Sequence, residues 1–193
     1  PWTVISYFSF RTRQFSHYTL GEPDNNYLFD LQRQGEDTLW AVSRQALYCM
    51  DIHTHVVKKM QPSDSACLGI STFCSDDSGC FWLGTLGYGL VHFDPTISEF
   101  RIIDDIRRQG ISSIYTICHD RGNIWLGTDH GLYCYDIASG RVSRFDSDEN
   151  TQGQVYYPLA SLKGQDGKLY FGGTNGFTQV DSRVIVYNTT QPR

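Results

Sequence analysis

The sequence has no long hydrophobic run and no excess of basic residues. No stretch approaches the roughly 18 consecutive apolar residues that a membrane helix needs, and the first residues lack the charged and apolar segments of an export signal. Its 16 lysines and arginines are outnumbered by 21 acidic residues, which gives a formal net charge of −5. Such a balance offers no basic field to nucleic acid or anionic lipid. We therefore expect no nucleic-acid partner and no membrane contact by this segment.

A helical period of 3.6 residues is also missing, whereas 40% hydrophobic and 14% aromatic residues suffice for a sizeable core. One aromatic position recurs at nearly constant spacing, with 42, 43 and 45 residues separating Trp40, Trp82, Trp125 and Tyr170. A glycine two residues after the aromatic recurs as Gly84, Gly127 and Gly172. A period of this length indicates a repeat architecture. We expect these seven residues to form the structural core of the repeat.

Each repeat contains four short segments rich in β-branched and aromatic residues, separated by glycine-containing turns. In the clearest copy we expect strands at residues 111–117, 123–127, 132–135 and 142–145. Four strands per repeat are typical of a propeller blade. The predicted fold class is all-β: a β-propeller, with about four four-stranded blades of an incomplete or open propeller that forms the C-terminal part of a larger ring.

The repeat boundaries divide the chain into successive units. We expect the outer half of a preceding blade at residues 1–20, a degenerate blade at 21–63, blades at 64–106 and 107–149, and a last blade at 150–183. The degenerate unit keeps Trp40 but lacks the glycines of the others. Because the chain begins at Pro1 rather than at a methionine, we expect it to be a segment of a longer polypeptide.

The text IYTICHDRGNIWLGTDHGLY at residues 114–133 resembles the two-component regulator propeller repeat. That repeat occurs in the periplasmic sensor region of hybrid two-component system histidine kinases. Residues 15–18 with 24–27 resemble the outer strand and inter-blade crossing of the family, and residues 171–177 resemble its closing blade. The likeness covers about residues 5–185, with Tyr170 standing where the family has tryptophan.

The resemblance implies a ligand-sensing segment in the periplasm that detects an oligosaccharide and signals to a histidine kinase outside this chain. Residues 184–193 would link to a following β-sandwich domain. The implied partners are an oligosaccharide ligand and the remaining propeller blades and downstream β-sandwich of the parent protein; a homodimer formed through the parent stays open. We expect no cofactor, no catalytic residue and no enzymatic activity in this segment, and the ligand-binding residues stay unassigned.

Two other functions remain alternatives. Propellers also host enzymes, so the chain could be a fragment of a glycan lyase or hydrolase, which paired carboxylates or a Tyr/His constellation at the channel mouth would favour. A generic protein-interaction scaffold is the third hypothesis. The histidines give no support to a catalytic triad, because they are scattered and no nucleophile with recognisable surroundings accompanies His17, His92, His119 and His130.

Two groups of residues resemble metal ligands or disulfides. Asp51, His53 and His55 alternate as ligands on one strand face could, but Asp51 aligns with turn residues, so we expect a solvated loop and no metal site. The six cysteines show no Cys-x-x-Cys spacing. Two pairs occupy equivalent repeat positions and are expected to be small buried hydrophobes, namely Cys49 with Cys134 and Cys74 with Cys118. A disulfide between Cys74 and Cys80, which flank a turn, stays open.

The remaining charged clusters are interpreted as structural. Asp76 and Asp77 precede Trp82 much as Asp120 precedes Trp125 and Asp166 precedes Tyr170, so we expect all of them to stabilise turns. The basic pairs are expected near outer strands or blade crossings, where charge discourages edge-to-edge pairing, and they lie at residues 58–59 and 107–108.

Overall fold

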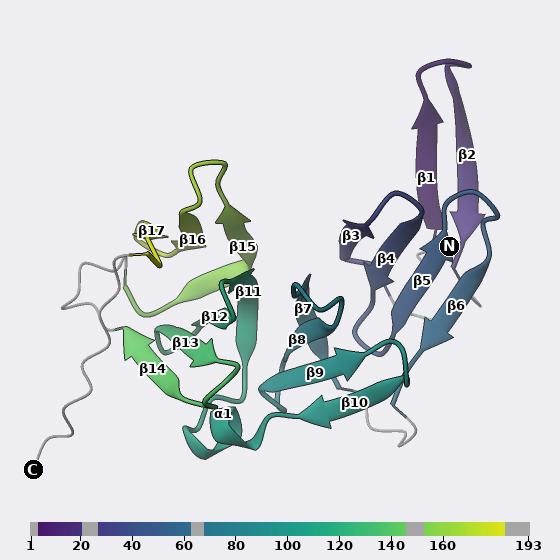
Figure 1. Ribbon diagram of the computed structural model, residues 1–193. Coiled ribbons are helices and arrows are strands. Elements are labelled where there is room, and N and C mark those ends of the chain that lie inside the picture. Colours follow the sequence, from purple (N-terminus) through teal and green to yellow (C-terminus); the bar gives the residue numbers. More distant parts are fainter. Residues whose placement is uncertain (1–3, 21–26, 63–67, 146–152, 184–193) are drawn as a thin grey trace, which may run out of the picture.

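The computed structural model describes residues 4–20, 27–62, 68–145 and 153–183, and these residues form antiparallel sheets arranged around an arc (Figure 1). A two-stranded hairpin comes first, with β1 (Val4–Ser9) and β2 (Gln14–Thr19). The first four-stranded sheet contains β3 (Asp30–Gln34), β4 (Thr38–Val42), β5 (Leu47–Asp51) and β6 (Val57–Met60). The second contains β7 (Ile70–Ser75), β8 (Phe81–Thr85), β9 (Leu90–Asp94) and β10 (Glu99–Ile102).

The third sheet contains β11 (Ile114–Asp120), β12 (Asn123–Thr128), β13 (Leu132–Asp136) and β14 (Val142–Phe145). Three strands of the last sheet are described, β15 (Tyr156–Lys163), β16 (Leu169–Gly173) and β17 (Gly176–Val180). In each sheet the strands pair in chain order, as the blades of a propeller do. The predicted all-β propeller fold is therefore confirmed. The expected link at residues 184–193 lies outside the described residues.

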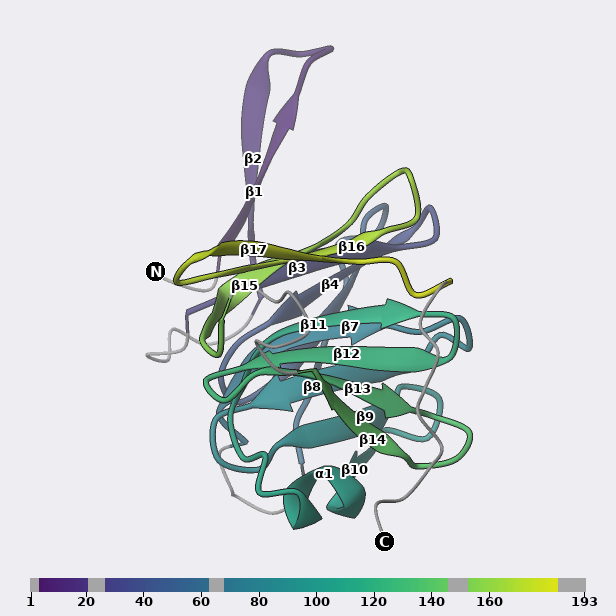
Figure 2. The same cartoon turned by 90° about the vertical axis from the view of Figure 1, so that its left-hand side faces the viewer.

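The first strands of the four sheets, β3, β7, β11 and β15, lie innermost and line one central cavity. Figure 2 shows the sheets from the side, with the later strands of each sheet farther from this centre. Serine hydroxyls join neighbouring inner strands, since Ser71 donates to the carbonyl of Ile114 and Ser161 donates to the carbonyl of Ile117. The inner strands are thus fixed to one another by side chains as well as by packing.

The first strand of the third blade was placed too early by sequence. It begins at Ile114 instead of residue 111 and runs on to Asp120. Only Arg121 and Gly122 form the following turn, both with positive φ (52° and 73°). Two residues of this kind make the tight primed turn whose twist matches a hairpin. Residues 111–113 belong instead to the crossing between blades.

That crossing holds a short helix, α1 (Asp104–Arg108), which the sequence pattern did not predict. Ile106 is fully buried and fixes the helix against the sheets. Acidic Asp104 and Asp105 lie in its first turn and basic Arg107 and Arg108 in its last, as the helix dipole favours. The basic pair at residues 107–108 therefore lies at a blade crossing, and the pair at 58–59 lies in the outer strand β6.

The repeated tryptophans pack against the blade that follows them. Trp40 lies 4.3 Å from Phe81 of the second blade, and Trp82 lies 5.8 Å from Tyr135 of the third, measured between ring centroids. Trp125 is fully buried in a cluster with residues of the last blade. Tyr170 occupies the equivalent position in the last blade and is only half-buried. Burial of the aromatic thus depends on the next sheet in the chain.

The repeated glycines lie on the second strand of each blade, and the first two permit the close approach of side chains from the first strand and from the next blade. A Cβ atom on Gly84 would lie 2.6 Å from Thr72 Cγ2 and 2.8 Å from Ile114 Cγ2. On Gly127 it would lie 2.5 Å from Thr116 Cγ2 and 2.9 Å from Tyr156 Cβ. Contacts below 3 Å require a shift of the structure. Gly172 is less constrained, because its nearest contact would be Ala160 Cβ at 3.2 Å.

The turn of the β1–β2 hairpin has the same geometry as the turns of the outer hairpins of the blades. Arg13 has φ 55°, His55 φ 59°, Ser98 φ 55° and Gly140 φ 71°, and each lies one or two residues before the second strand of its hairpin. In three of these turns the N–H of that residue donates to the carbonyl four residues earlier, at 2.7 to 2.9 Å. The β1–β2 hairpin therefore has the same turn geometry as the outer hairpins of the blades, and the outer half of a preceding blade at residues 1–20 stays a prediction.

Candidate functional site

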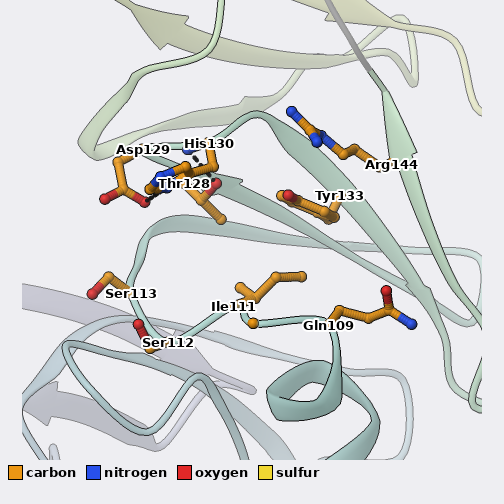
Figure 3. Close-up of a pocket in the computed structure, with 10 residues that line it drawn as sticks. Gln109, Ile111, Ser112, Ser113, Thr128, Asp129, His130, Tyr133 and Arg144 are labelled. Carbon is orange, nitrogen blue, oxygen red and sulfur yellow. Dashed lines mark hydrogen bonds and ion pairs between the residues drawn. The ribbon is translucent and has the colours of Figure 1, made fainter.

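A pocket of about 270 Å³ lies where the crossing into the third blade meets the β12–β13 loop (Figure 3). Gln109, Ile111, Ser112 and Ser113 form its lower wall in the figure. The opposite wall is formed by Thr128, Asp129, His130, Tyr133 and Arg144. Loops carried by a rigid sheet are where binding residues concentrate, and a concave surface with several polar groups is suited to a ligand. We treat it as the candidate binding site.

The β12–β13 loop is held in one conformation by a buried hydroxyl. Thr128 Oγ1 donates to the carbonyl of Gly131 at 2.8 Å and accepts from the N–H of His130 at 3.0 Å. The two preceding blades repeat the arrangement, through Thr85 in the second and Ser43 in the first. All three hydroxyl-bearing residues are buried. The side chains that the loop presents to solvent are therefore preorganised, which reduces the entropy lost on binding.

The lower wall of the pocket, formed by the crossing, is also held by hydrogen bonds. The carbonyl of Ser112 accepts hydrogen bonds from the N–H groups of Gly87 (2.8 Å) and Gly89 (2.9 Å) in the neighbouring loop. The N–H of Ile111 donates to the carbonyl of Ile106 at 3.3 Å. A Cβ on Gly89 would lie 2.6 Å from the carbonyl oxygen of Ile111, so glycine is needed there for the two segments to approach.

Charged and aromatic side chains meet in the pocket. The guanidinium carbon of Arg144 lies 5.8 Å from the centroid of the Tyr133 ring, and the two residues pair across β13 and β14. The Asp129 carboxylate lies 2.7 Å from His130 Nδ1, and both side chains are exposed enough to reach a ligand, at 42% and 76%. The guanidinium of Arg144 is close enough to the Tyr133 ring for a favourable cation–π interaction.

The central cavity is a second candidate, of about 290 Å³. Residues from four strands line it, and three of these strands contribute polar side chains, among them Asp30, Gln32, Thr72, Ser161 and Lys163. Burial raises the pKa of Asp30, with the N–H of Leu31 opposing this shift. Gln32 is already engaged, because its side-chain amide donates to the carbonyl of Phe73 at 3.0 Å.

The expectation that Asp120 stabilises a turn is wrong. Its side chain is 3% exposed and lies 2.7 Å from Lys163 Nζ on the inner strand of the last blade. The hydroxyl of Ser182 also donates to it. Burial raises the pKa of Asp120, but the bonds from Lys163 and Ser182 outweigh burial, so the pKa is below its ordinary value. Asp120 therefore joins two blades instead of closing its own hairpin.

The structural equivalent of Asp120 in the second blade is Asp76, not Asp77. Asp76 Oδ2 accepts from Trp82 Nε1 at 2.8 Å, and Asp76 Oδ1 accepts from the N–H of Ser78 at 2.8 Å. Partial burial raises the pKa of Asp76, but these hydrogen bonds outweigh it and the pKa is lowered. Asp166 does act in its turn, accepting from the N–H of Lys168 at 3.1 Å and from the Tyr170 hydroxyl at 3.0 Å.

The hydrogen-bond acceptor of the tryptophan indole N–H group differs from blade to blade. Trp40 Nε1 donates to Gln34 Oε1 at 2.8 Å, at the position equivalent to Asp76. Trp125 Nε1 is buried, and no hydrogen-bond acceptor for it is found within the described ranges. The carboxylate that would serve it, on Asp120, is turned toward the last blade.

The two histidines of the sequence Asp51–His55 lie in the β5–β6 turn, as expected. His53 is 69% exposed and its Nε2 lies 2.8 Å from Asp37 Oδ1, and His55 stacks on Tyr18 with 4.2 Å between ring centroids. Asp51 Oδ1 accepts from the N–H groups of His53 and Thr54. Among the residues that the structure describes, no group of three or more His, Cys, Asp or Glu side chains is arranged to hold a metal ion.

The cysteines occupy the equivalent positions that the repeat predicted. Cys74 and Cys118 each lie opposite a tryptophan on the first strand, and Cys49 and Cys134 do so on the third. Burial raises the pKa of the Cys118 thiol to about 11, with nearby Lys163 opposing this. The disulfide left open above is not formed: Cys74 and Cys80 are free thiols, because Cys80 lies opposite Asp76. Cys67 lies outside the described residues.

The pocket residues were not identified from the sequence, and the other histidines lie apart from one another. His17 is on β2, His92 on β9 and His119 on β11. Asp129 and Arg144 give no motif, and only the spatial meeting of two loops with β13 and β14 brings them together.

The described part of the chain contains no helix long and apolar enough to cross a membrane.

No family model matches the chain. Histidine kinase P4 of Formosa agariphila is 26% identical over 92 residues, covering 46% of this chain and 7% of that kinase. The extracellular domain described as that of a hybrid two-component system from B. thetaiotaomicron has a TM-score of 0.72 at 17% identity, covering 92% of this chain and 25% of that one. Virginiamycin B lyase from Staphylococcus aureus has a TM-score of 0.67 at 13% identity, covering 93% and 63%.

These likenesses define the class of fold: a β-propeller similar to the extracellular domains of hybrid two-component systems. The likeness to sensor regions that the text of residues 114–133 predicted is confirmed at this level. The chain spans less than two thirds of the length of each of these proteins, and only 7% of the kinase.

Proposed function

We propose that this chain is a ligand-sensing part of the extracytoplasmic region of a hybrid two-component sensor. It detects an oligosaccharide, and the signal passes to a histidine kinase elsewhere in the parent protein. The proposal is supported by the repeat text and by the fold shared with extracellular domains of such systems. The periplasm is the proposed compartment.

The observation that carries the proposal at residue level is the pocket between the crossing and the β12–β13 loop. Both walls are held by backbone hydrogen bonds and by a buried threonine hydroxyl. Most of the side chains that they present are polar, with Arg144, the ring of Tyr133 and apolar Ile111 among the lining residues. A rigid frame carrying mixed polar groups suits a hydroxyl-rich ligand better than an apolar one.

The remaining blades and the downstream β-sandwich of the parent are proposed as intramolecular partners, and a parent homodimer is a further proposal. Tyr170 supports the first of these, since its equivalents are buried by a following sheet whereas Tyr170 is half-exposed. We likewise propose the blade boundary at residues 106–107, whereas the expected boundaries at 63–64 and 149–150 lie outside the described residues.

The test is calorimetric titration of the complete extracytoplasmic region against a panel of neutral and acidic glycan oligomers, with product analysis by chromatography. We expect binding of at least one oligomer without turnover, and weak or no binding by the isolated segment. Failure of every oligomer to bind the complete region would overturn the proposal.

An enzymatic role is the second candidate, because virginiamycin B lyase shares the fold with a TM-score of 0.67. In that case a propeller of this kind would cleave its ligand instead of reporting it. The same chromatographic analysis distinguishes the two, since any cleaved product formed by the pure protein would favour the enzyme. Fold alone decides nothing here, because one fold hosts unrelated functions.

A further inference from the structure

The indole N–H of Trp125 is a buried donor for which the described residues provide no acceptor. Its ring is fully buried between the third and last blades. A buried donor left unpaired costs free energy, so such groups are rare in folded proteins. The equivalent aromatic of each other blade does have an acceptor: Trp40 donates to Gln34, Trp82 to Asp76 and Tyr170 to Asp166. The third blade is therefore the exception.

The acceptor that the third blade could use is Asp120. Cys118 lies opposite Trp125, and Asp120 follows two residues later, so the three side chains share one face of the blade. The second blade has the same arrangement, with Asp76 two residues after the cysteine that lies opposite Trp82. There the carboxylate accepts from the indole N–H at 2.8 Å. Asp120 thus has the strand position and the face from which Trp125 can be served.

Two groups of the last blade hold Asp120 away from the indole. The ammonium group of Lys163 lies 2.7 Å from its carboxylate, and the hydroxyl of Ser182 donates to it. Because Lys163 is about half-exposed, water competes for its ammonium group and the ion pair contributes modestly. Arg183 also lies near Asp120, but its guanidinium donates to Asp181 at 2.6 and 2.7 Å. The position of Asp120 therefore depends mainly on Lys163 and Ser182.

Two positions are thus open to the Asp120 carboxylate. In the observed one it is bonded to the last blade, and the Trp125 indole is left unpaired. In the other, rotation of the side chain brings the carboxylate to the indole N–H, and the half-exposed Lys163 is solvated instead. Each position makes hydrogen bonds that the other lacks. Such an exchange of partners is what gives a structural element two discrete states.

We propose that Asp120 is a conformational switch between the last two blades. Bonded to Lys163 and Ser182, it joins β11 to the last blade. Bonded to Trp125, it completes the hydrogen bonds of its own blade and releases the last one. Any displacement of the last blade that draws Lys163 away favours the second state, because it removes the competing partner. The switch lies outside the lining of the candidate pocket and requires no particular ligand, so it stands independently of the proposed function.

The experiment follows the indole N–H of Trp125 by NMR in the complete extracytoplasmic region, labelled at its tryptophan indole nitrogens. Substitution by phenylalanine assigns the resonances of Trp125 and Trp82, and the second gives the position of an indole bonded to a carboxylate. We expect Lys163→Met to move the Trp125 proton resonance downfield, toward that of Trp82, because the freed carboxylate turns to the indole. Lys168→Met, which removes another lysine of the last blade, should leave the Trp125 resonance unchanged.

The double variant Lys163→Met/Asp120→Ala separates the switch from a general loosening of the last blade. It should abolish the downfield shift, since no carboxylate remains to accept from the indole. A shift that persists in the double variant would overturn the proposal, and so would an unmoved Trp125 resonance in Lys163→Met alone. An unchanged Trp82 resonance verifies that each variant is folded.

Urea unfolding provides a second, independent measurement. Lys163→Met should lower the unfolding midpoint more in the Trp125→Phe background than in wild type, because without the indole the freed Asp120 carboxylate has no alternative donor in its own blade. Equal losses in the two backgrounds would show that Asp120 and Trp125 are not coupled and would overturn the switch.

Discussion

The carboxylate of Asp120 and the ammonium group of Lys163 lie 2.7 Å apart and join the inner strands of the last two blades. The carboxylate is buried, whereas Lys163 is about half-exposed. Because one partner is in contact with water, the pair contributes less than a fully buried one. Its position nevertheless fixes β15 against β11 at the end where Ser182 follows β17.

Asp120→Asn should lower the free energy of unfolding by about 1 to 2 kcal/mol at neutral pH. The pKa of Asp120 is lowered in the folded chain, so its stabilisation is present above the ordinary value of 3.8 and is lost as the pH falls through the folded pKa. The difference between wild type and variant should therefore shrink below pH 3.8. Urea unfolding at a series of pH values measures this.

Asp105→Asn is the control for that experiment. It removes the exposed ion pair with Arg108, at 3.0 Å, and should cost a few tenths of a kcal/mol. A gap between wild type and Asp120→Asn that persists unchanged at low pH would show that the carboxylate charge is not the source of the effect.

Trp125→Ala should lower stability by about 3 to 5 kcal/mol, because the ring is fully buried between the third and last blades. Tyr170→Ala, at the equivalent and half-exposed position, should have a much smaller effect. The unfolding midpoints in urea measure both. Equal effects of the two substitutions would contradict the view that the following blade buries the repeated aromatic.

Gly127→Ala should destabilise the chain by about 1 to 3 kcal/mol, because its Cβ would lie 2.5 Å from Thr116 Cγ2 and 2.9 Å from Tyr156 Cβ. Gly172→Ala is the matched control, with its nearest contact at 3.2 Å. There the lower unfolded-state entropy of alanine offsets the crowding. Thermal unfolding of the two variants should therefore differ, and similar midpoints would disprove the close-approach argument.

Ser98→Gly should stabilise the chain by about 0.5 kcal/mol, since Ser98 has a φ of 55° that glycine adopts without cost. Part of the gain is lost to the greater freedom of glycine in the unfolded chain. Ser98→Ala provides the comparison, because alanine keeps the strained φ. If Ser98→Gly is no more stable than Ser98→Ala in chemical denaturation, the turn does not hold residue 98 in the left-handed conformation.

Periodic features were predictable from the sequence and local exceptions were not. The spacing of Trp40, Trp82 and Trp125 was sufficient to predict blades, because each ring performs the same packing role in its repeat. Asp120 was misassigned because its counterparts Asp76 and Asp166 do accept turn N–H groups, whereas Asp120 bonds Lys163 of the last blade.

The pocket was beyond sequence analysis for a different reason. Gln109, Asp129 and Arg144 lie on separate segments and recur in no motif. Their meeting depends on α1, whose five residues are too few to show a helical period, and on the course of the crossing after it. A contact between the crossing and β14 is set by the relative placement of two sheets.

The hydroxyl that stabilises the loop after the second strand occurs in three successive blades, as Ser43, Thr85 and Thr128. The hydrogen-bonding pattern is similar each time, while the side chains differ, with Gln45, Tyr88 and His130 bonded through their N–H groups to that hydroxyl. Mutational drift can therefore diversify what these loops display without disturbing the sheet beneath them. A combinatorial library at these loop positions would sample new specificities on an unchanged backbone, much as variable loops do on an antibody framework.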